Sequence, residues 1–163
     1  MIEIQVSEDT LVKSANRAKE MGKLKNSITE GQGNLSGFVG EQVVSDYYGF
    51  TIRNTYDYDL ITKGGKKVDV KTKRTTVKPK PHYECSIAAF NTKQKCDTYF
   101  FVRVSSDLKT AWILGYKMKE EYFKRAKLLK KGDIDLDNSF TVKADCYNLP
   151  ISELDQLPCS EYK

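Results

Sequence analysis

The stretch Lys67-Val68-Asp69-Val70-Lys71-Thr72-Lys73 decides the fold of this 163-residue chain. Its β-branched residues predict a strand, in which successive side chains point to opposite faces of a sheet. Asp69 and Lys71 therefore share one face, whereas Val68 and Val70 point the other way, into a core. A carboxylate and an ammonium group on the same face of one strand indicate a site for a charged ligand.

A second acidic position lies a short distance before this strand, in Tyr58-Asp59-Leu60. The segment between them, residues 61–66, contains Gly64-Gly65, which predicts a tight turn because glycine readily adopts positive φ angles. The resulting hairpin would return Asp69 to the neighbourhood of Asp59. Two carboxylates and one lysine brought together on a sheet form a candidate site for Mg²⁺ and a phosphate group.

A third acid, Glu41, lies on a helix that we expect from about residue 34 to residue 48, with Asn34 as its N-cap and Gly49 at its end. At 100° per residue, Glu41 shares a row with small or apolar residues, namely Gly37, Val44 and Tyr48. A more polar edge of the helix consists of Gln42, Ser45 and Asp46. A carboxylate on an apolar row costs free energy unless it is paired or close to a cation. The glycines at 37 and 40 allow a close approach to a sheet.

Composition indicates one folded domain with reduced thiols. The chain is 39% hydrophobic and long enough to bury a core, which argues against a disordered protein. It has no run of about 20 apolar residues, the length that spans a bilayer. Residues 1–6 alternate like a strand and lack the layout of a signal peptide. The four cysteines include no Cys-x-x-Cys pair and favour free thiols over a zinc site. We therefore expect a cytoplasmic protein without a membrane partner.

Positive charge is concentrated around the candidate site. Residues 63–80 contain eight basic side chains and one acid, a net charge of +7, whereas residues 133–163 carry seven acids and two bases, a net charge of −5. Such a positive field attracts a polyanion and raises its local concentration. The side chains expected to contact the phosphate backbone of DNA are Lys66, Lys67, Lys73, Arg74, Lys78 and Lys80. The alternative is a solvated lysine-rich loop.

Periodicity predicts the remaining elements. Helices are expected near residues 9–23 and 117–130, and the apolar row of the first consists of Leu11, Val12, Ala15, Ala18 and Met21. Strands are expected near residues 50–53, 57–62, 66–73, 83–89, 98–104, 110–114 and 140–146. Pro79 and Pro81 break the chain before the fourth of these strands, because proline cannot donate to a strand ladder. The sequence contains no internal repeat and no boundary between domains.

Three motifs, in this order, resemble those of the PD-(D/E)xK nuclease superfamily, which has the restriction-endonuclease-like fold: Gly37-Phe38-Val39-Gly40-Glu41, Tyr58-Asp59-Leu60 and Asp69-Val70-Lys71. Tyr58 stands where the superfamily's name has proline. The resemblance implies an α/β fold with a mixed central sheet flanked by helices, in a single domain over residues 1–163 with a motif core at about 34–115. In that fold the helix with the glutamate precedes a three-stranded meander, and a further helix leads to a fourth strand.

The resemblance also implies Mg²⁺-dependent cleavage of phosphodiester bonds in DNA, with Mn²⁺ as a substitute. The catalytic residues would be Glu41, Asp59, Asp69 and Lys71. The metal ligands would be the carboxylates of Glu41, Asp59 and Asp69 and the main-chain carbonyl of Val70. The reaction itself requires these residue types, because Mg²⁺ prefers oxygen ligands and a lysine can orient the attacking water or stabilise the phosphate oxygens.

The expected activity is that of a DNA endonuclease, acting as a homodimer if it cuts both strands of a duplex. Three alternatives stay open: an inactive DNA-binding module of the same fold, a structure-specific resolvase of the Holliday-junction type, and an RNA-directed or structural protein that uses only the basic face. The acid–lysine set favours the nuclease over the binding module, because a protein that only binds gains nothing from acids beside phosphates. Sequence preference and strand polarity are not specified by these residues.

Overall fold

The computed structural model describes residues 1–22, 35–53, 55–135 and 140–156. In these ranges the protein is mixed α/β, with three α-helices and a curled, mixed six-stranded sheet in the order β1-β7-β6-β4-β3-β2. The strands of this sheet are β1 (Ile2–Gln5), β2 (Thr51–Ile52), β3 (Leu60–Ile61), β4 (Lys67–Thr75), β6 (Thr98–Ser105) and β7 (Thr110–Met118). The neighbours β4 and β6 run parallel, and the other neighbouring pairs are antiparallel.

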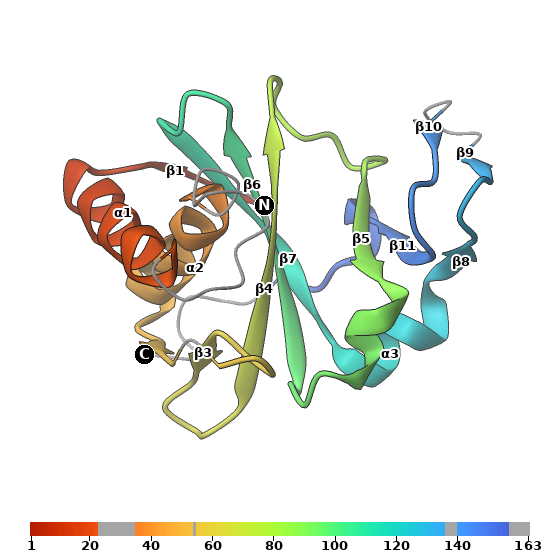
Figure 1. Ribbon diagram of the computed structural model, residues 1–163, viewed down its shortest axis with the longest axis horizontal. Helices are drawn as coiled ribbons and strands as arrows, with labels where there is room; N and C mark the ends of the chain where they lie inside the picture. Colours follow the sequence, from red (N-terminus) through yellow and green to blue (C-terminus); the bar gives the residue numbers. More distant parts are fainter. Residues whose placement is uncertain (23–34, 54, 136–139, 157–163) are drawn as a thin grey trace.

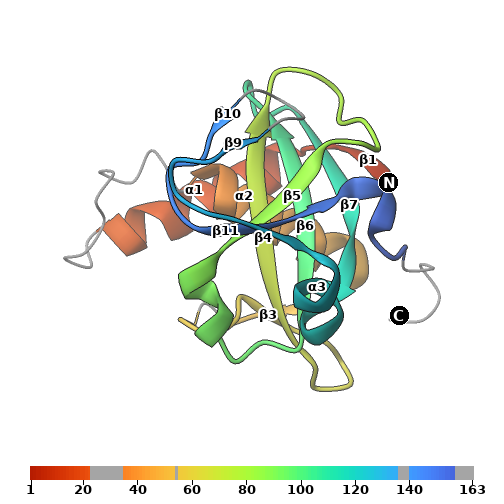
Figure 2. The ribbon, with the colours of Figure 1, turned by 90° about the vertical axis from the view of Figure 1, so that its right-hand side faces the viewer.

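The main sheet is covered on both faces (Figure 1). Helices α1 (Glu8–Gly22) and α2 (Leu35–Tyr48) lie on one face. The other face, turned toward the viewer in Figure 2, carries helix α3 (Lys119–Arg125) and a second sheet in the order β5-β11-β8. Its strands are β5 (Glu84–Ala88), β11 (Cys146–Pro150) and β8 (Lys127–Leu129). The smaller elements are the pair β9 (Ile134–Asp135) and β10 (Phe140–Thr141) and the 3₁₀ turns η1 (Ala89–Lys93) and η2 (Ile151–Glu153).

Strand β6 is buried on both faces and supplies both hydrophobic cores. Phe100, Val102 and Val104 belong to the core beneath α2. The alternate residues Tyr99 and Phe101 belong to the core beneath the second sheet, together with side chains from β7 and α3. A strand covered on both faces needs apolar residues throughout, which explains the run Tyr-Phe-Phe-Val in place of an alternating pattern.

Helix α2 lies in close contact with strand β4 at Gly40. A Cβ atom at this position would lie 2.0 Å from the hydroxyl oxygen of Thr72, so only glycine fits. The close approach expected at Gly40 is therefore confirmed. At Gly37 a Cβ atom would meet nothing within 4 Å, so that glycine is not needed for packing.

The predicted hairpin and helix end are also confirmed. Strands β3 and β4 are antiparallel neighbours, and Gly65 in the turn between them has a φ of +82°. Helix α2 ends at Tyr48, where Gly49 has a φ of +70° and donates its N–H to Ser45 O over 2.8 Å. Both glycines have the left-handed conformation that other residues avoid. The predicted N-cap, Asn34, lies outside the described residues.

Two predicted elements differ in the structure. The helix expected at 117–130 is only Lys119–Arg125, because β7 continues to Met118 and residues 127–129 pair as β8 with β11. The helix implied between the meander and the fourth strand is replaced by β5 and the turn η1. A parallel pair such as β4 and β6 needs a long crossover, and here a strand of the second sheet supplies it.

Helix α1 buries a more polar face than its apolar pattern predicts. Val12 and Met21 are exposed, whereas Thr10 and Ser14 are buried. The reason is hydrogen bonding, since Ser14 Oγ donates to Thr10 O over 2.7 Å and Thr10 Oγ1 donates to Asp46 of α2 over 3.3 Å. Gln42 and Ser45, expected on the polar edge of α2, are buried as well. None of the helices in the described ranges is long and apolar enough to cross a membrane.

We predict that Gly40→Ala destabilises the protein by about 1–3 kcal/mol, the usual cost of overpacking, because the new methyl group displaces Thr72. The matched control is Gly37→Ala in the same helix, which should leave stability unchanged or raise it by up to about 1 kcal/mol. Thermal unfolding of the two variants measures the difference. Equal melting temperatures for both would show that α2 is not held against β4 at Gly40.

Candidate functional site

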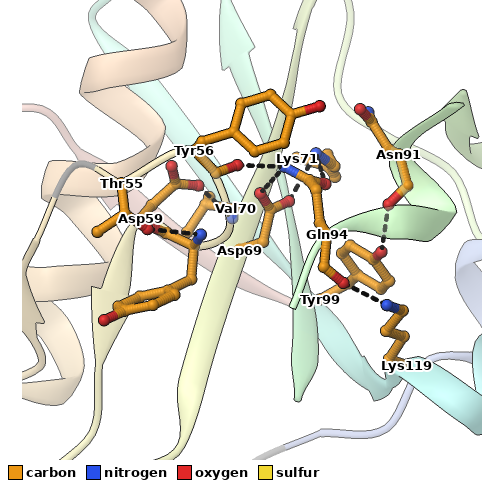
Figure 3. Close-up of polar contacts among 11 residues, drawn as sticks. Thr55, Tyr56, Asp59, Asp69, Val70, Lys71, Asn91, Gln94, Tyr99 and Lys119 are labelled. Carbon is orange, nitrogen blue, oxygen red and sulfur yellow. Dashed lines mark hydrogen bonds and ion pairs between the residues drawn. The ribbon is translucent and has the colours of Figure 1, made fainter. Parts of the chain in front are cut away.

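Asp59 lies where strand β3 separates from β4. The two strands pair only through Leu60 and Ile61 of β3. The next hydrogen bond runs from Asp59 N–H to Val68 O over 2.9 Å. Farther along β4, where β3 no longer pairs with it, the Asp59 side chain forms the next hydrogen bond. Its Oδ2 accepts from Val70 N–H at 2.7 Å (Figure 3). The carboxylate of Asp59 is therefore fixed at the edge of β4.

Strand β4 presents Asp69 and Lys71 on one face, as its alternation predicts. Lys71 Nζ lies 2.6 Å from Asp69 Oδ2, and Asp69 is buried. Val68 and Val70 point the other way, into the core beneath α2. The Asp69–Lys71 contact is an ion pair without the geometry of a hydrogen bond, so Asp69 Oδ2 accepts no hydrogen bond from the described residues. The Lys71 ammonium group neutralises this oxygen, so a metal ion that binds Asp69 would have to share the carboxylate with Lys71 or displace it.

Gln94, on the segment that leads into β6, joins Asp69 to Lys71 (Figure 3). Its Nε2 donates to Asp69 Oδ1 and to Tyr56 O, each over 3.1 Å, and its Oε1 accepts from Lys71 Nζ at 3.2 Å. Its own main-chain carbonyl accepts a hydrogen bond from Lys119 Nζ. Both ends of the Gln94 amide are used, so this side chain holds the carboxylate, the ammonium group and the neighbouring loop in one arrangement.

Glu41 reaches the same site from α2 and is paired with Arg17 of α1. Arg17 Nη2 donates to Glu41 Oε2, and each of these side chains is 13% exposed. The guanidinium also lies over the ring of Phe38, 4.7 Å from its centroid. The residue before Glu41, Gly40, is the one that contacts Thr72 of β4. The charge of Glu41 is close enough there to raise the pKa of Asp59.

The site contains more acids than bases. Glu41, Asp59 and Asp69 carry three negative charges when ionised, whereas Arg17 and Lys71 carry two positive charges, so the net charge is −1. Burial, followed by the charges of Glu41 and Asp69, raises the pKa of Asp59 to about 8. Burial also raises the pKa of Glu41, although the Arg17 guanidinium lowers it. Near neutral pH the site therefore retains a proton on Asp59 unless another cation neutralises the excess charge.

The donor atoms fit a Mg²⁺ ion, which usually binds one or two carboxylates and keeps several waters. Asp69 Oδ2 is buried and lies 2.6 Å from Lys71 Nζ, so the ion would share this carboxylate with the ammonium group. The carbonyl of Val70 points to the same edge of β4 as its N–H, which is bound to Asp59. As the side chains stand, no three acidic, histidine or cysteine side chains of the described residues converge on one point. Asp59, Asp69 and Val70 would hold the ion, and Glu41 would have to leave Arg17 to become a direct ligand.

The basic residues expected to contact DNA are spread along β4 and beyond both of its ends. Lys66 and Lys67 lie at the start of the strand, close to Asp69, and Lys67 Nζ is 5.5 Å from the ring centroid of Tyr58. Lys73 shares the face of Asp69, two positions beyond Lys71. Lys67 and Lys73 therefore lie on the same face of β4 as Asp69 and Lys71.

The other three cations lie at the far end of β4. Arg74 Nη2 donates to Ser106 O over 2.6 Å, and Lys78 Nζ forms an ion pair with Glu3 at 2.7 Å. Lys80 is exposed beyond the strand. A strand of this length spans about 25–30 Å, so the six predicted DNA contacts do not form a single patch around the carboxylates.

A cavity of about 160 Å³ opens beside Lys71, between the main sheet and β5. The charged and polar residues whose side chains share this face of the sheet or lie on β5 are Lys71, Lys73, Arg103, Glu84 and Ser86. Arg103 is buried there and donates from Nη2 to Glu84 O over 2.7 Å. The cavity does not include Asp59 or Asp69, so the paired carboxylates lie outside it.

The sequence did not reveal Gln94 and Arg17. The signal for Gln94 was topological, because the residues that lead into a parallel neighbour of β4 arrive at the end of β4 that carries Asp69. Arg17 lies on the predicted first helix, and only the packing of α1 against α2 brings it to Glu41. Both residues depend on contacts between segments far apart in the chain.

We predict that Asp59→Asn stabilises the metal-free protein more at pH 8 than at pH 5. The pKa of Asp59 lies above its ordinary value of 3.8, so the folded state binds the proton more tightly and wild-type stability falls as the pH rises from about 4 to about 8. Asparagine removes this loss and can still accept from Val70 N–H. The melting temperatures of wild type and Asp59→Asn, recorded in EDTA at pH 5 and at pH 8, measure this difference in stability.

The matched control is Asp57→Asn, which neutralises a neighbouring acid and keeps an acceptor for Lys95 N–H. Its melting temperature relative to wild type should change little between pH 5 and pH 8. The account of the site is wrong if Asp59→Asn and Asp57→Asn show the same dependence on pH.

Neither a scan against protein-family models nor a search of curated proteins finds a match for this chain. The functional conclusion therefore depends on the chemistry of the site formed by Asp59, Asp69, Lys71, Gln94 and Glu41.

Proposed function

We propose that this chain is a metal-dependent DNA endonuclease of the PD-(D/E)xK type. The observation that carries the proposal is the meeting of Asp59, Asp69 and Lys71 at one edge of β4, where buried acids outnumber bases. Near neutral pH and without metal, the proton retained on Asp59 leaves the site without net charge. A divalent cation that replaces this proton changes the net charge to +1 and makes the site attractive to a phosphodiester. The basic side chains along the same strand would support binding of the polyanion.

Hydrolysis adds the elements of water across one phosphorus–oxygen bond. The oxygen of a water molecule forms a bond to phosphorus, the bond from phosphorus to one sugar oxygen breaks, and a proton from the water ends on that sugar oxygen. Bound Mg²⁺ would supply positive charge to the phosphate and acidify the water. The products are a phosphate monoester and an alcohol.

The residues of this chain divide the remaining tasks. Asp59 and Asp69 would hold the ion, with Val70 O as a further ligand, and the hydrogen bond from Val70 N–H keeps Asp59 oriented. Lys71 Nζ contacts Asp69 and Gln94. It would donate to the attacking water or to a phosphate oxygen. Gln94 touches neither reacting atom in this account and acts by positioning Asp69 and Lys71.

We predict that Asp69→Asn abolishes cleavage of plasmid DNA with Mg²⁺ and leaves DNA binding intact or tighter, because a repelling charge is lost together with a metal ligand.

Lys71→Ala should lower the cleavage rate by about 10²–10³-fold, which is typical for a removed transition-state donor. Single-turnover cleavage with Mg²⁺, with EDTA as the blank, measures both variants.

The matched control for Lys71 is Lys73→Ala, which removes the same charge from the same face of β4, away from Asp69. It should weaken DNA binding without the loss of rate at saturating protein. For Asp69 the control is Asp107→Asn, in the turn between β6 and β7. Near wild-type cleavage by Asp69→Asn would refute the site, and a wild-type protein that binds DNA without cutting it would instead be a binding module.

A further inference from the structure

Two exposed aromatic rings lie on segments that also carry residues of the candidate site. Tyr56 is 79% exposed and Phe90 is 67% exposed. Single exposed aromatic residues are common on proteins and need no special explanation. These two differ in their position, because Tyr56 lies on the loop that leads to Asp59 and Phe90 lies in η1, which leads to Gln94. Each ring therefore belongs to a segment that also supplies a residue of the site.

The backbone that carries Tyr56 is held firmly although its ring is in solvent. The turn over residues 55–58 is closed by the Thr55 hydroxyl, which donates to Tyr58 O over 2.8 Å and accepts from Tyr58 N–H at 3.0 Å. Tyr56 O accepts from Gln94 Nε2, the same group that binds Asp69. In Figure 3 the ring extends from this loop toward Asn91, over the side of the site where Asp69, Lys71 and Gln94 meet.

Two positive charges lie on the same segment as Phe90. Lys93 in η1 and Lys95 next to Gln94 are both exposed. Lys95 N–H donates to Asp57 Oδ1 over 3.1 Å, which ties the η1 segment to the loop of Tyr56. Proteins that bind single-stranded nucleic acid combine cations along the backbone with aromatic rings that stack on bases. Both components are present on these two linked segments.

We propose that Tyr56 and Phe90 form a stacking platform for an unpaired base, so that the DNA strand in the site carries an unpaired nucleotide beside the cleaved phosphate. The proposal rests on the proposed nuclease function and specifies its substrate class. In a regular duplex both faces of each base are covered by neighbouring bases. A ring can stack on a base only where that stack is open, as in a bulge, a flap or a single strand.

The test compares a fully paired duplex with the same duplex containing one bulged 2-aminopurine. The two DNAs carry almost the same phosphate charge, so a difference in affinity reports recognition of the bulge. Binding is followed in EDTA, where no cleavage occurs, by anisotropy and by quenching of the 2-aminopurine fluorescence. Wild type should bind the bulged DNA more tightly and quench its fluorescence.

Tyr56→Ala should lower the affinity for the bulged DNA by about 5- to 150-fold, the range for loss of one stacked base. Tyr56→Phe keeps the ring and should retain the preference, whereas Tyr56→Leu keeps an apolar side chain without the π-face and should lose it. Ile134→Ala, an exposed apolar residue on β9, is the matched control and should bind as wild type does. The proposal is overturned if wild type shows no preference or if Tyr56→Ala retains it.

The same proteins, assayed for cleavage with Mg²⁺, separate the two proposals. If wild type prefers the bulged DNA in a way that depends on Tyr56 but cleaves neither DNA, the stacking platform is supported and the nuclease function is refuted. If wild type and Tyr56→Ala cleave both DNAs equally, the nuclease function is supported and the stacking platform is refuted.

Discussion

The contact between Gly40 of α2 and Thr72 of β4 holds the helix that carries Glu41 against the strand that carries Asp69 and binds Asp59. A methyl group at residue 40 would lie 2.0 Å from the Thr72 hydroxyl oxygen. The helix therefore lies closer to the strand than it could with any residue other than glycine at position 40. Glu41, the next residue, is thereby placed near Asp59, whose carboxylate is bound to the edge of the same strand. The close packing at Gly40 thus contributes to the raised pKa of Asp59, because the helix held there carries Glu41.

The consequence of this packing is an excess of buried negative charge. Burying carboxylates costs free energy unless cations or hydrogen bonds compensate them. Arg17 and Lys71 form ion pairs with Glu41 and Asp69. Asp59 has no such partner among the described residues, and burial, followed by the charges of Glu41 and Asp69, raises its pKa to about 8. A core that served stability alone would gain by replacing these acids with apolar residues. We infer that they are kept for a ligand that brings positive charge.

Local patterns predicted part of this site, and contacts between distant segments decided the rest. Alternation along β4 placed Asp69 and Lys71 on one face, and the glycine turn predicted the hairpin to Asp59. The contributions of Gln94 and Arg17 could not be predicted, because they depend on the parallel pairing of β4 with β6 and on the packing of α1 on α2. The third helix was predicted too long for a similar reason, since residues 127–129 pair with β11, farther along the chain.

The central claim is that the carboxylates of Asp59 and Asp69 bind a divalent cation. The most direct test is a titration with Mn²⁺, followed by electron paramagnetic resonance, of wild type, Asp59→Asn, Asp69→Asn and the control Asp57→Asn. The account predicts saturable binding to wild type and Asp57→Asn that Mg²⁺ displaces, and at least tenfold weaker binding to each of the other two variants. Binding of equal strength to all four proteins, or no binding to wild type at millimolar Mn²⁺, would contradict it.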